Sequence, residues 1–565
     1  MDFKQLKRAC DALLAQRDQY KSDWCRIARK VHPTGWAEIL KAQGGESTPK
    51  PNYCETAAMC CQTLATAHSM GITPSTALWF LISSPLTGGG KRSDDAFKYS
   101  LKLSKALWRA WGLGNFTQAF AKMWMDRCGI GHGATHVRVN QADGRLVFTH
   151  IPAGSFAFAK DESGRCNTIV REFDLSPCEA VKRYGRENLG KKLMKDYEDV
   201  GKRYTEMHRF LHVILPNEDG QPGSFDRAPK QRLFTEYIIH PEDEKIVQEN
   251  GLYEFPFMVT RFLEYGSNPY GISPAQLAEK SIDRAEDMDK VMDILGHQAV
   301  EPPMLTPVPM VGMVDYRPAA TTPVPDDYLG GNYPRPLAPQ GRYDIGQERI
   351  REAKEMIKLV FYYDVVLPLT GIDKVMTAEE VRRLVNEKTS NFVHSFSQAI
   401  DDLTPFLEAS LAMLYRWALK HDKLGDDGVL PKVPSELQDD ILLQAEDGED
   451  VYFNRFNVTF TSKMAVAIQD ATNQGDLQGL QQAAAMVEMT GNAELLDYLK
   501  MDNILKDVWL WLSANPDNLR SDKEVQAIRD KRAEAQQEQQ AMQAAMAAGQ
   551  VARDFGSVQQ KEAQQ

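Results

Sequence analysis

The chain has 565 residues, of which 43% are apolar and 25% charged, and a formal net charge of −12. Its length predicts roughly two to four domains with ample capacity for a core, and no run of about twenty apolar residues could span a membrane. The acidic balance argues against a protein that grips nucleic acid tightly, because such binding neutralises phosphates and leaves a basic patch or a high pI. Any contact with DNA should therefore be loose, or local to a few lysines and arginines.

The N-terminal part, to about residue 125, has the apolar spacing of helices. It opens with an amphipathic segment and lacks the apolar centre of a signal peptide, so we expect synthesis inside the cell. All eight cysteines lie between Cys10 and Cys178, and no Cys-x-x-Cys occurs. Adjacent Cys60 and Cys61 fall within a helical pattern. Buried free thiols are therefore a better interpretation than disulfides or a zinc site.

At about Ala134 the apolar period changes from that of a helix to that of a strand. Short segments bounded by Asp, Gly and Pro predict a block of strands with one short helix, at residues 177–183. The strands are predicted at residues 135–139, 145–151, 155–158, 168–173, 208–215, 233–239 and 255–262.

The most distinctive stretch holds two helix-period segments on either side of a proline-rich interruption. The first follows Ser273-Pro274, which read as an N-cap and a proline at the first helical position. One face of this segment carries an apolar stripe, at Ala278, Ile282, Ala285, Met288, Met292, Leu295 and Ala299. The interruption, residues 301–343, is too long for an ordinary connection and too apolar for a flexible linker. It predicts a shaped tip carried on two helical legs.

The second leg repeats the stripe, at Ile350, Ala353, Ile357 and Val360. Asp344 to Gln347 form a plausible capping box for its start, and Thr377 to Glu380 form another that begins a long helix. That helix carries apolar residues to Trp417, and Pro405 should kink it. Beyond residue 420 lie an acidic, mixed region to about residue 461, helices at 475–515 and an Ala/Gln-rich helical tail. The predicted fold class is α+β, mainly helical.

The motifs that resemble active sites are all incomplete. A phosphate loop at residues 87–93 would need glycine where Pro85 stands and Ser or Thr where Arg92 stands. The turn around Ser273 is no nucleophile elbow, because Pro274 has no N–H to offer an oxyanion. Residues 129–134 read as a glycine turn between helix and strand, rather than a dinucleotide-binding motif.

The candidate metal ligands are equally incomplete. His132 and His136 have the spacing of a zinc pair, but they fall in a glycine turn and a strand, and with His150 they read as core or surface histidines. The acidic runs at 286–289 and 446–450 have no histidine partner and read as solvated faces or a channel wall. We therefore expect no catalytic residue, no metal and no cofactor, and a protein that is not an enzyme.

Taken together, these segments resemble the portal proteins, or head-to-tail connectors, of short-tailed phages. The resemblance rests on Pro-Tyr-Gly-Ile-Ser-Pro at 269–274 and on Thr-Gly-Ile-Asp-Lys-Val-Met-Thr-Ala-Glu-Glu-Val at 370–381. The strand-rich block, Val-Thr-Phe-Thr-Ser-Lys-Met-Ala at 458–465 and the Gln/Ala tail agree with it. Each motif is short and only the combination, which extends over nearly the whole chain, is specific.

In that family a ring, usually of twelve subunits, sits at one capsid vertex and passes double-stranded DNA during packaging and ejection. Carried over, the resemblance implies a wing at residues 1–267, a first stem helix at 268–300, a clip at 301–345, a second stem helix at 346–363 and a tunnel loop at 364–376. The long helix and the rest of the wing would occupy 377–470, a crown 471–520, and a helical tail or barrel 521–565.

The resemblance also implies partners and a place. The partners would be further copies of the chain, DNA, the packaging terminase, tail adaptors, and the major capsid and scaffolding proteins, with no membrane. The place would be the portal vertex of the virion, reached from the host cytoplasm during assembly. Alternative classes are a tail adaptor, an internal scaffold or, despite the missing phosphate loop, a packaging ATPase.

The basic residues of the stem and the tunnel loop are the candidates for contact with DNA. They are Lys374, Lys280, Arg284, Lys290, Arg351, Lys354 and Lys358. Sparse cations on a mostly negative wall would keep phosphate contacts few, so that a moving duplex does not stick. The alternative for Arg351, Lys354 and Lys358 is ordinary intrahelical pairing with neighbouring glutamates, at Glu348, Glu352 and Glu355.

Overall fold

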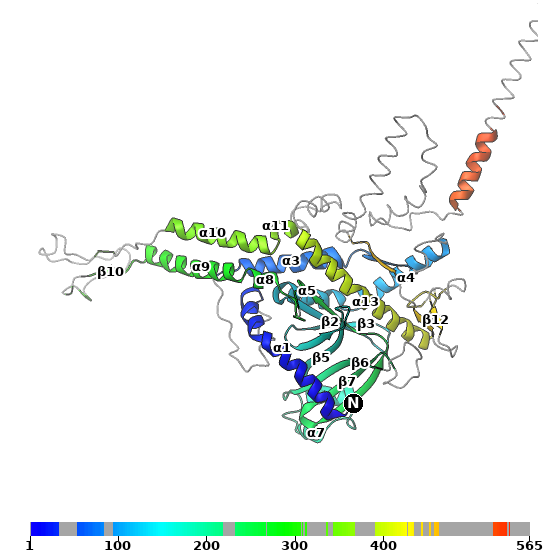
Figure 1. Ribbon diagram of the computed structural model, residues 1–565, viewed down its shortest axis with the longest axis horizontal. Coiled ribbons are helices and arrows are strands. Elements are labelled where there is room, and N and C mark those ends of the chain that lie inside the picture. Colours follow the sequence, from blue (N-terminus) through cyan, green and yellow to red (C-terminus); the bar gives the residue numbers. More distant parts are fainter. Residues whose placement is uncertain are drawn as a thin grey trace, which may run out of the picture.

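The computed structural model describes residues 2–32, 54–83, 94–218, 232–266, 268–306, 308, 311–312, 335–336, 343–367, 390–425, 428–433, 442–444, 451–453, 457–462, 524–538 and 542. Figure 1 shows a body of helices and sheets from which two helices, α9 (Glu279–Val300) and α10 (Tyr343–Val360), project side by side. Within the described part of the chain, no helix is both long and apolar enough to cross a membrane.

The N-terminal part is helical, as predicted, with one exception. Its helices are α1 (Phe3–Val31), α3 (Thr56–Ile72), α4 (Asp94–Leu113) and α5 (Phe116–Ile130). The exception is β1 (Phe80–Ser83), which pairs antiparallel with β14 (Asn457–Phe460). This pairing joins the segment around Val458 to the N-terminal helices, where Trp79, Trp111 and Phe460 share one core. All eight cysteines are free thiols, and six of them are buried.

The strand-rich block forms two antiparallel sheets. A three-stranded sheet has the order β3-β2-β9, from β2 (His132–Val139), β3 (Leu146–Ile151) and β9 (Phe257–Arg261). A five-stranded sheet has the order β4-β5-β6-β7-β8, from β4 (Phe156–Lys160), β5 (Cys166–Leu175), β6 (His208–Pro216), β7 (Phe234–His240) and β8 (Lys245–Leu252). All the predicted strands are confirmed. The edge strand β8 was not predicted, because its sequence, Lys-Ile-Val-Gln-Glu-Asn-Gly-Leu, is largely polar.

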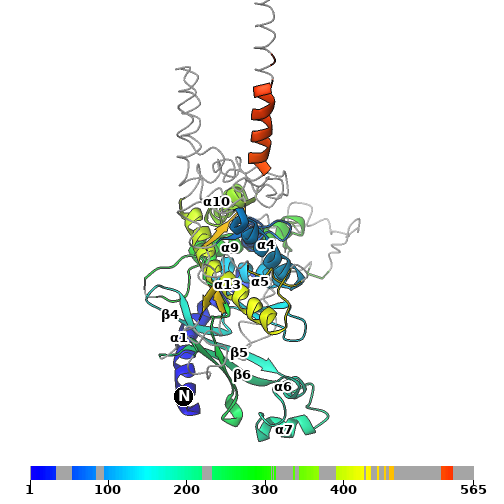
Figure 2. The same ribbon diagram turned by 90° about the vertical axis from the view of Figure 1, so that its right-hand side faces the viewer.

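Helices cover both faces of the five-stranded sheet. The apolar stripe of α1 packs on one face, where Leu6, Cys10 and Leu14 meet Leu211 and Ile239. On the other face lie α6 (Pro177–Tyr184), α7 (Lys191–Glu198) and the 3₁₀ turn η4 (Pro241–Asp243). Figure 2 shows α1 running along the sheet, with α6 and α7 together at the lower end of the sheet. The helix α6 was predicted, whereas the short, highly charged α7 was not.

The projecting pair begins where two glycine motifs meet. The helix α5 ends at Gly131, whose φ of 109° lies in the left-handed region. A Cβ on Gly131 would lie 2.3 Å from the carbonyl oxygen of Gly271, and the reverse distance is also 2.3 Å. Just beyond, Ser273 caps α8 (Pro274–Leu277) with a complete capping box to Gln276. The predicted N-cap with proline at the first helical position is therefore confirmed.

The second leg starts earlier than predicted. Because α10 begins at Tyr343, Asp344 lies in its first turn and is not its N-cap, so the predicted start at residue 346 is wrong. Its end at residue 363 is also wrong: α10 stops at Val360, Tyr362 turns the chain with a φ of 54°, and α11 (Tyr363–Val366) follows. The predicted tunnel loop thus opens as a helical turn, and its residues 368–376 lie outside the described residues.

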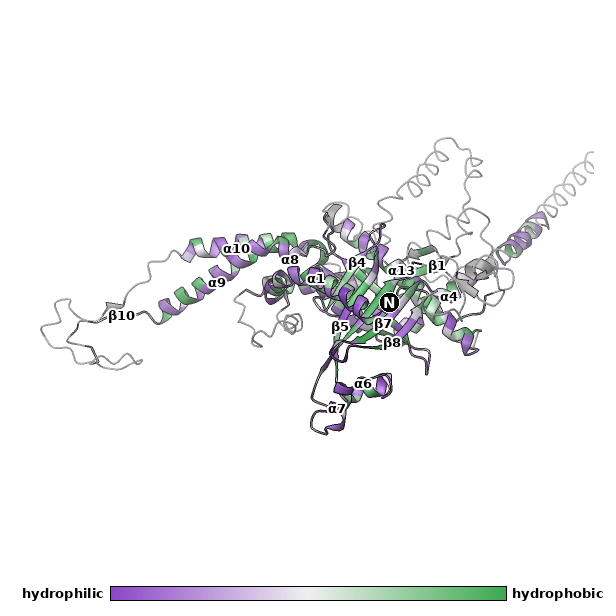
Figure 3. Cartoon of the chain, turned by 60° about the horizontal axis from the view of Figure 1, so that its bottom comes forward, coloured by the Kyte–Doolittle hydropathy of each residue, from purple (hydrophilic) through white to green (hydrophobic). Residues whose placement is uncertain are grey.

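The predicted apolar stripes are buried only toward the body. Ile282, Ala285 and Met292 of α9 and Ala353 and Ile357 of α10 are buried. Farther out on α9, Leu295 is half-buried and Ala299 is exposed. Figure 3 shows hydrophobic and hydrophilic residues mixed along both helices. A short ladder between β10 (Met304–Leu305) and β11 (Arg335–Pro336) brings the two ends of the proline-rich segment together.

The remaining described elements are the long helix, short strands and part of the tail. The helix α13 (Ser390–Lys420) continues through Pro405 and buries Phe396, Leu403 and Leu411. The strands β12 (Leu442–Gln444) and β13 (Val451–Phe453) form a hairpin, and residues 524–538 are helical. The second predicted capping box, at 377–380, and the helices predicted at 475–515 lie outside the described residues.

Candidate nucleic-acid interface

The two projecting helices differ in charge. The helix α9 carries six acidic and three basic side chains, whereas α10 carries four of each. A groove of about 800 Å³ lies between their outer parts, lined by Asp289 and Asp293 of α9 and by Arg351, Lys354 and Lys358 of α10. The charged side chains on the α9 side of this groove are both acidic. The α10 side carries Asp344, Glu348 and Glu355 beside its three cations, so the lining as a whole is acidic.

The basic residues predicted on α10 differ in their contacts. The Nζ atom of Lys354 lies 3.0 Å from a carboxylate oxygen of Asp289, so this lysine joins α10 to α9. The Nζ atom of Lys358 lies 5.7 Å from the ring centroid of Tyr363, within cation–π range. Arg351 is exposed at the groove. The ion pair of Lys354 crosses to the other helix, so this residue has neither of the two roles expected from its spacing, DNA contact or pairing within its own helix.

The basic residues predicted on α9 are all exposed. Lys280, Arg284 and Lys290 project from the helix surface, four and six residues apart. Lys374 lies outside the described residues. Sequence reasoning missed one further cation, Arg349, which is exposed on α10 and was hidden in a run of alternating charges.

Ion pairs fix the base of α9 to the body. Arg26 and Lys30 of α1 contact the carboxylate of Glu279 at 2.5 Å and 3.2 Å, and Lys30 also contacts Asp283 at 2.5 Å. Burial alone would raise the pKa of Glu279, but the hydrogen bonds from Arg26 and Lys30 outweigh it and hold the pKa below its ordinary value. Glu279 and Asp283 are therefore paired at the base of α9, and Asp289 is paired farther along the helix with Lys354.

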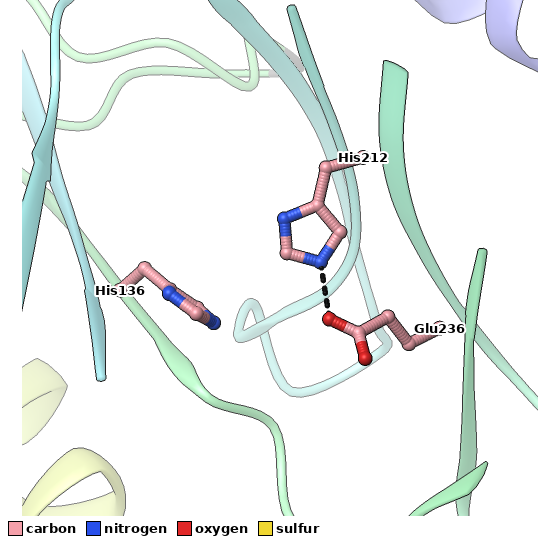
Figure 4. Close-up of side chains that lie close together, drawn as sticks. All are labelled: His136, His212 and Glu236. Carbon is pink, nitrogen blue, oxygen red and sulfur yellow. Dashed lines mark ion pairs between the residues drawn. The ribbon is translucent and has the colours of Figure 1, made fainter. Parts of the chain in front are cut away.

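The histidines singled out in the sequence lie away from α9 and α10. His132 is buried in β2 and not in the glycine turn that was predicted, while His150 on β3 contacts Asp126 at 2.9 Å. His136 faces the five-stranded sheet, where it meets the ion pair between His212 and Glu236, with an Nε2–Oε1 distance of 2.7 Å (Figure 4). Burial and the nearby His212 and Arg171 hold the pKa of His136 well below its ordinary value.

Comparisons with known proteins agree on one family. The family described as "Bacteriophage head to tail connecting protein" matches residues 3–519. A portal protein of Salmonella phage epsilon15 is 22% identical over 573 residues, 98% of this chain and 96% of that protein. A probable portal protein of Bordetella phage BPP-1 is 23% identical over 560 residues, 94% of this chain and 91% of that protein.

A solved structure, the neck of an empty gene transfer agent (GTA) particle computed with C6 symmetry, is 12% identical over 68% of this chain and 88% of that chain, with a TM-score of 0.31. The family match spans nearly the whole sequence, and it agrees with the family indicated by the sequence motifs. The chain belongs to the bacteriophage head-to-tail connecting protein family.

Proposed function

We propose that this chain is the subunit of a portal: a ring at one capsid vertex that passes double-stranded DNA during packaging and ejection and has no enzymatic activity. Its membership of the connector family and its full-length relatives named as portal proteins support this function. In this ring α9 and α10 are the stem, residues 301–342 the clip, and residues 364–376 the loop nearest the DNA. The wing is formed by the two sheets with the N-terminal helices and α13, and residues 471–520 and 521–565 are the crown and the tail.

The main observation in favour of a ring is the apolar surface on the projecting helices. Val291 and Ile294, three residues apart on α9, are exposed, as are Met356 and Leu359 on α10, the last of them at 69%. Within the described part of the chain these side chains remain open to solvent. Helices that project from the body with apolar side chains on their flanks suit burial against a neighbouring copy. In a closed ring, each apolar flank would be buried against one neighbouring subunit.

The charges of the stem suit the passage of a duplex. The excess of carboxylates on α9 repels phosphate, and the cations that remain exposed are few. We propose Lys280, Arg284, Lys290, Arg351 and Lys358 as weak contacts of the DNA, with Lys374 on the loop. Lys354 is better assigned to holding the two stem helices together, because its ammonium group is paired with Asp289.

The same ring would present the clip to the packaging terminase first and to tail adaptors later. Its wing would meet the major capsid and scaffolding proteins at the vertex, after assembly in the host cytoplasm. The ladder between β10 and β11 supports a defined clip, since it closes the base of that segment.

The first test is the state of assembly. Electron microscopy and mass measurement of the purified chain should show a closed ring, expected to be a dodecamer, with a central channel. A chain that stays monomeric at micromolar concentration and has no ring form would contradict the proposal. The same preparation should not hydrolyse ATP, and hydrolysis would favour the packaging ATPase instead.

The second test is charge reversal on the loop. Lys374→Glu should leave ring assembly intact while altering DNA packaging or retention. The control is Lys4→Glu, a reversal at an exposed position of α1 in the wing, which should leave both unchanged. Normal packaging by Lys374→Glu would remove that residue from the proposed contacts.

A further inference from the structure

A second group of histidines lies at the end of the five-stranded sheet, away from the stem. His208 is the first residue of β6, His240 is the last residue of β7, and Glu242 follows in η4. The strand register sets Leu211 opposite Ile239, which places His240 opposite Phe210 and therefore diagonal to His208 on the same face. One nitrogen of each histidine and a carboxylate oxygen of Glu242 all lie within 4.8 Å of one another.

Three of the four imidazole nitrogens of this group are buried without a hydrogen-bond partner among the described residues. His208 is 3% exposed and His240 is 0% exposed. Within the part of the chain that the structure describes, the Nε2 atom of His240 and both ring nitrogens of His208 have no hydrogen-bond partner. His208 Nε2 lies 3.2 Å from Asp196 Oδ2, but without the geometry of a hydrogen bond. Burying a polar atom without a partner costs free energy and is uncommon in proteins, so these nitrogens are candidates for binding a ligand.

One of the two histidines is held in the orientation that a metal ligand needs. This histidine is His240, whose Nδ1–H donates a hydrogen bond to Oδ2 of Asp243 at 3.0 Å. The Nε2 lone pair of His240 is therefore directed away from that carboxylate. Asp243 in turn accepts hydrogen bonds from the backbone N–H groups of Lys192 and Leu193, in the first turn of α7. A Cβ on Gly190 would lie 2.1 Å from the carboxylate carbon of Asp243, so glycine is required there for this approach. A carboxylate behind a ligating histidine is the common arrangement in protein metal sites.

We propose that His208, His240 and Glu242 form a Zn²⁺ site that fastens α7 and η4 to the end of the sheet. Two imidazoles and one carboxylate are a donor set that zinc accepts, with its fourth position left for solvent. Glu242 is exposed, so the ion has a route to the site from solvent. Its carboxylate now lies 2.5 Å from the Nζ atom of Lys192, a side chain that is 60% exposed and free to swing away.

The histidine cluster of Figure 4 is a poorer candidate and a useful internal control. Both oxygens of Glu236 are already engaged there, one by His212 and the other by the side-chain amide of Asn250. The half-buried guanidinium of Arg171 also acts on His136, and a further cation would be repelled there. The two clusters lie on the same face of the sheet. Among the described residues, three ring nitrogens of His208 and His240 lack a hydrogen-bond partner, against one, the Nε2 atom of His212, in the other cluster.

The test is to titrate zinc into the full-length chain after treatment with a chelator and to measure binding by calorimetry. Co²⁺ replaces zinc in a parallel titration, in which its ligand-field spectrum is recorded. One ion per chain should bind to the wild type, and Mg²⁺ should not compete. His240→Ala should abolish binding, and Asp243→Asn should weaken it by roughly 10- to 100-fold, as expected for a group that orients a ligand. Lys192→Met should tighten binding, because it removes the cation that competes for Glu242.

The control variant His136→Gln should bind zinc as the wild type does. Should His240→Ala fail to fold, Lys192→Met and the Co²⁺ spectrum of the wild type still decide the matter. A wild-type chain that takes up no zinc, or zinc uptake that is lost in His136→Gln and retained in His240→Ala, would overturn the proposal.

Discussion

Two glycine-to-alanine changes in the same projecting element should have opposite effects on stability. Gly271 precedes α8 at the base of the stem, where its backbone lies against that of Gly131. Gly296 lies near the outer end of α9, and a Cβ added there meets nothing within 4 Å. The chemical change is identical, so the difference isolates the contact at the base.

The expected magnitudes follow from the surroundings of each Cβ. In Gly271→Ala the new atom would lie 2.3 Å from the carbonyl oxygen of Gly131 and 3.0 Å from the backbone nitrogen of Phe262. Both neighbours are backbone atoms, so the clash requires a shift of β9 or of the turn after α5. Overpacking of this kind costs about 3 kcal/mol. In Gly296→Ala the helix gains about 1 kcal/mol, because alanine loses less conformational entropy than glycine in a helix interior.

The assay is urea unfolding of the unassembled chain, followed by circular dichroism at one protein concentration. We expect a lower midpoint for Gly271→Ala and a higher one for Gly296→Ala, with similar slopes. Equal stability of Gly271→Ala and the wild type would refute the reasoning, since it would mean that the two glycine turns are not in contact. A destabilised Gly296→Ala would mean that the outer part of α9 is not a solvent-exposed helix in the unassembled chain.

Three further predictions concern ionisable groups. Burial raises the pKa of Asp402 to about 6, although Arg261 opposes it, so the folded state binds the extra proton between about pH 4 and 6. The free energy of unfolding should therefore fall by about 1.4 kcal/mol per pH unit as pH rises through that window, and Asp402→Asn should lack that slope in urea titrations at several pH values. Glu279→Gln should lower the free energy of unfolding by about 1 kcal/mol at neutral pH, and the difference from the wild type should shrink as the wild-type carboxylate is protonated in acid. Burial raises the pKa of Cys60 and of Cys128 to about 12, so both thiols should resist alkylation in the folded chain and react after unfolding, as mass spectrometry of peptides can check.

Much of the local structure could be predicted because it depends on the near neighbours of each residue. Apolar spacing predicted α9, α10 and every strand of the two large sheets except β8, and Ser273-Pro274 predicted the start of α8. Elements whose own sequence is polar were missed. The strand β8 and the helix α7 are held by the sheet beside them, so their periodicity carries little signal. The start of α10 was misplaced because a capping-box pattern also fits the first turn of a helix.

The sequence by itself determined the class of protein and the order of its parts: helices, a strand-rich block, two legs around a proline-rich tip, and a long helix. Short-range periodicity and turn residues suffice for that. Only the tertiary structure decided which distant groups meet. It pairs β1 with β14, sets Gly131 against Gly271, takes Lys354 out of the set of exposed cations by pairing it with Asp289, and gathers His208, His240 and Glu242 at one corner. Contacts of this kind depend on the packing of whole sheets and helices, which the spacing of residues along one chain does not encode.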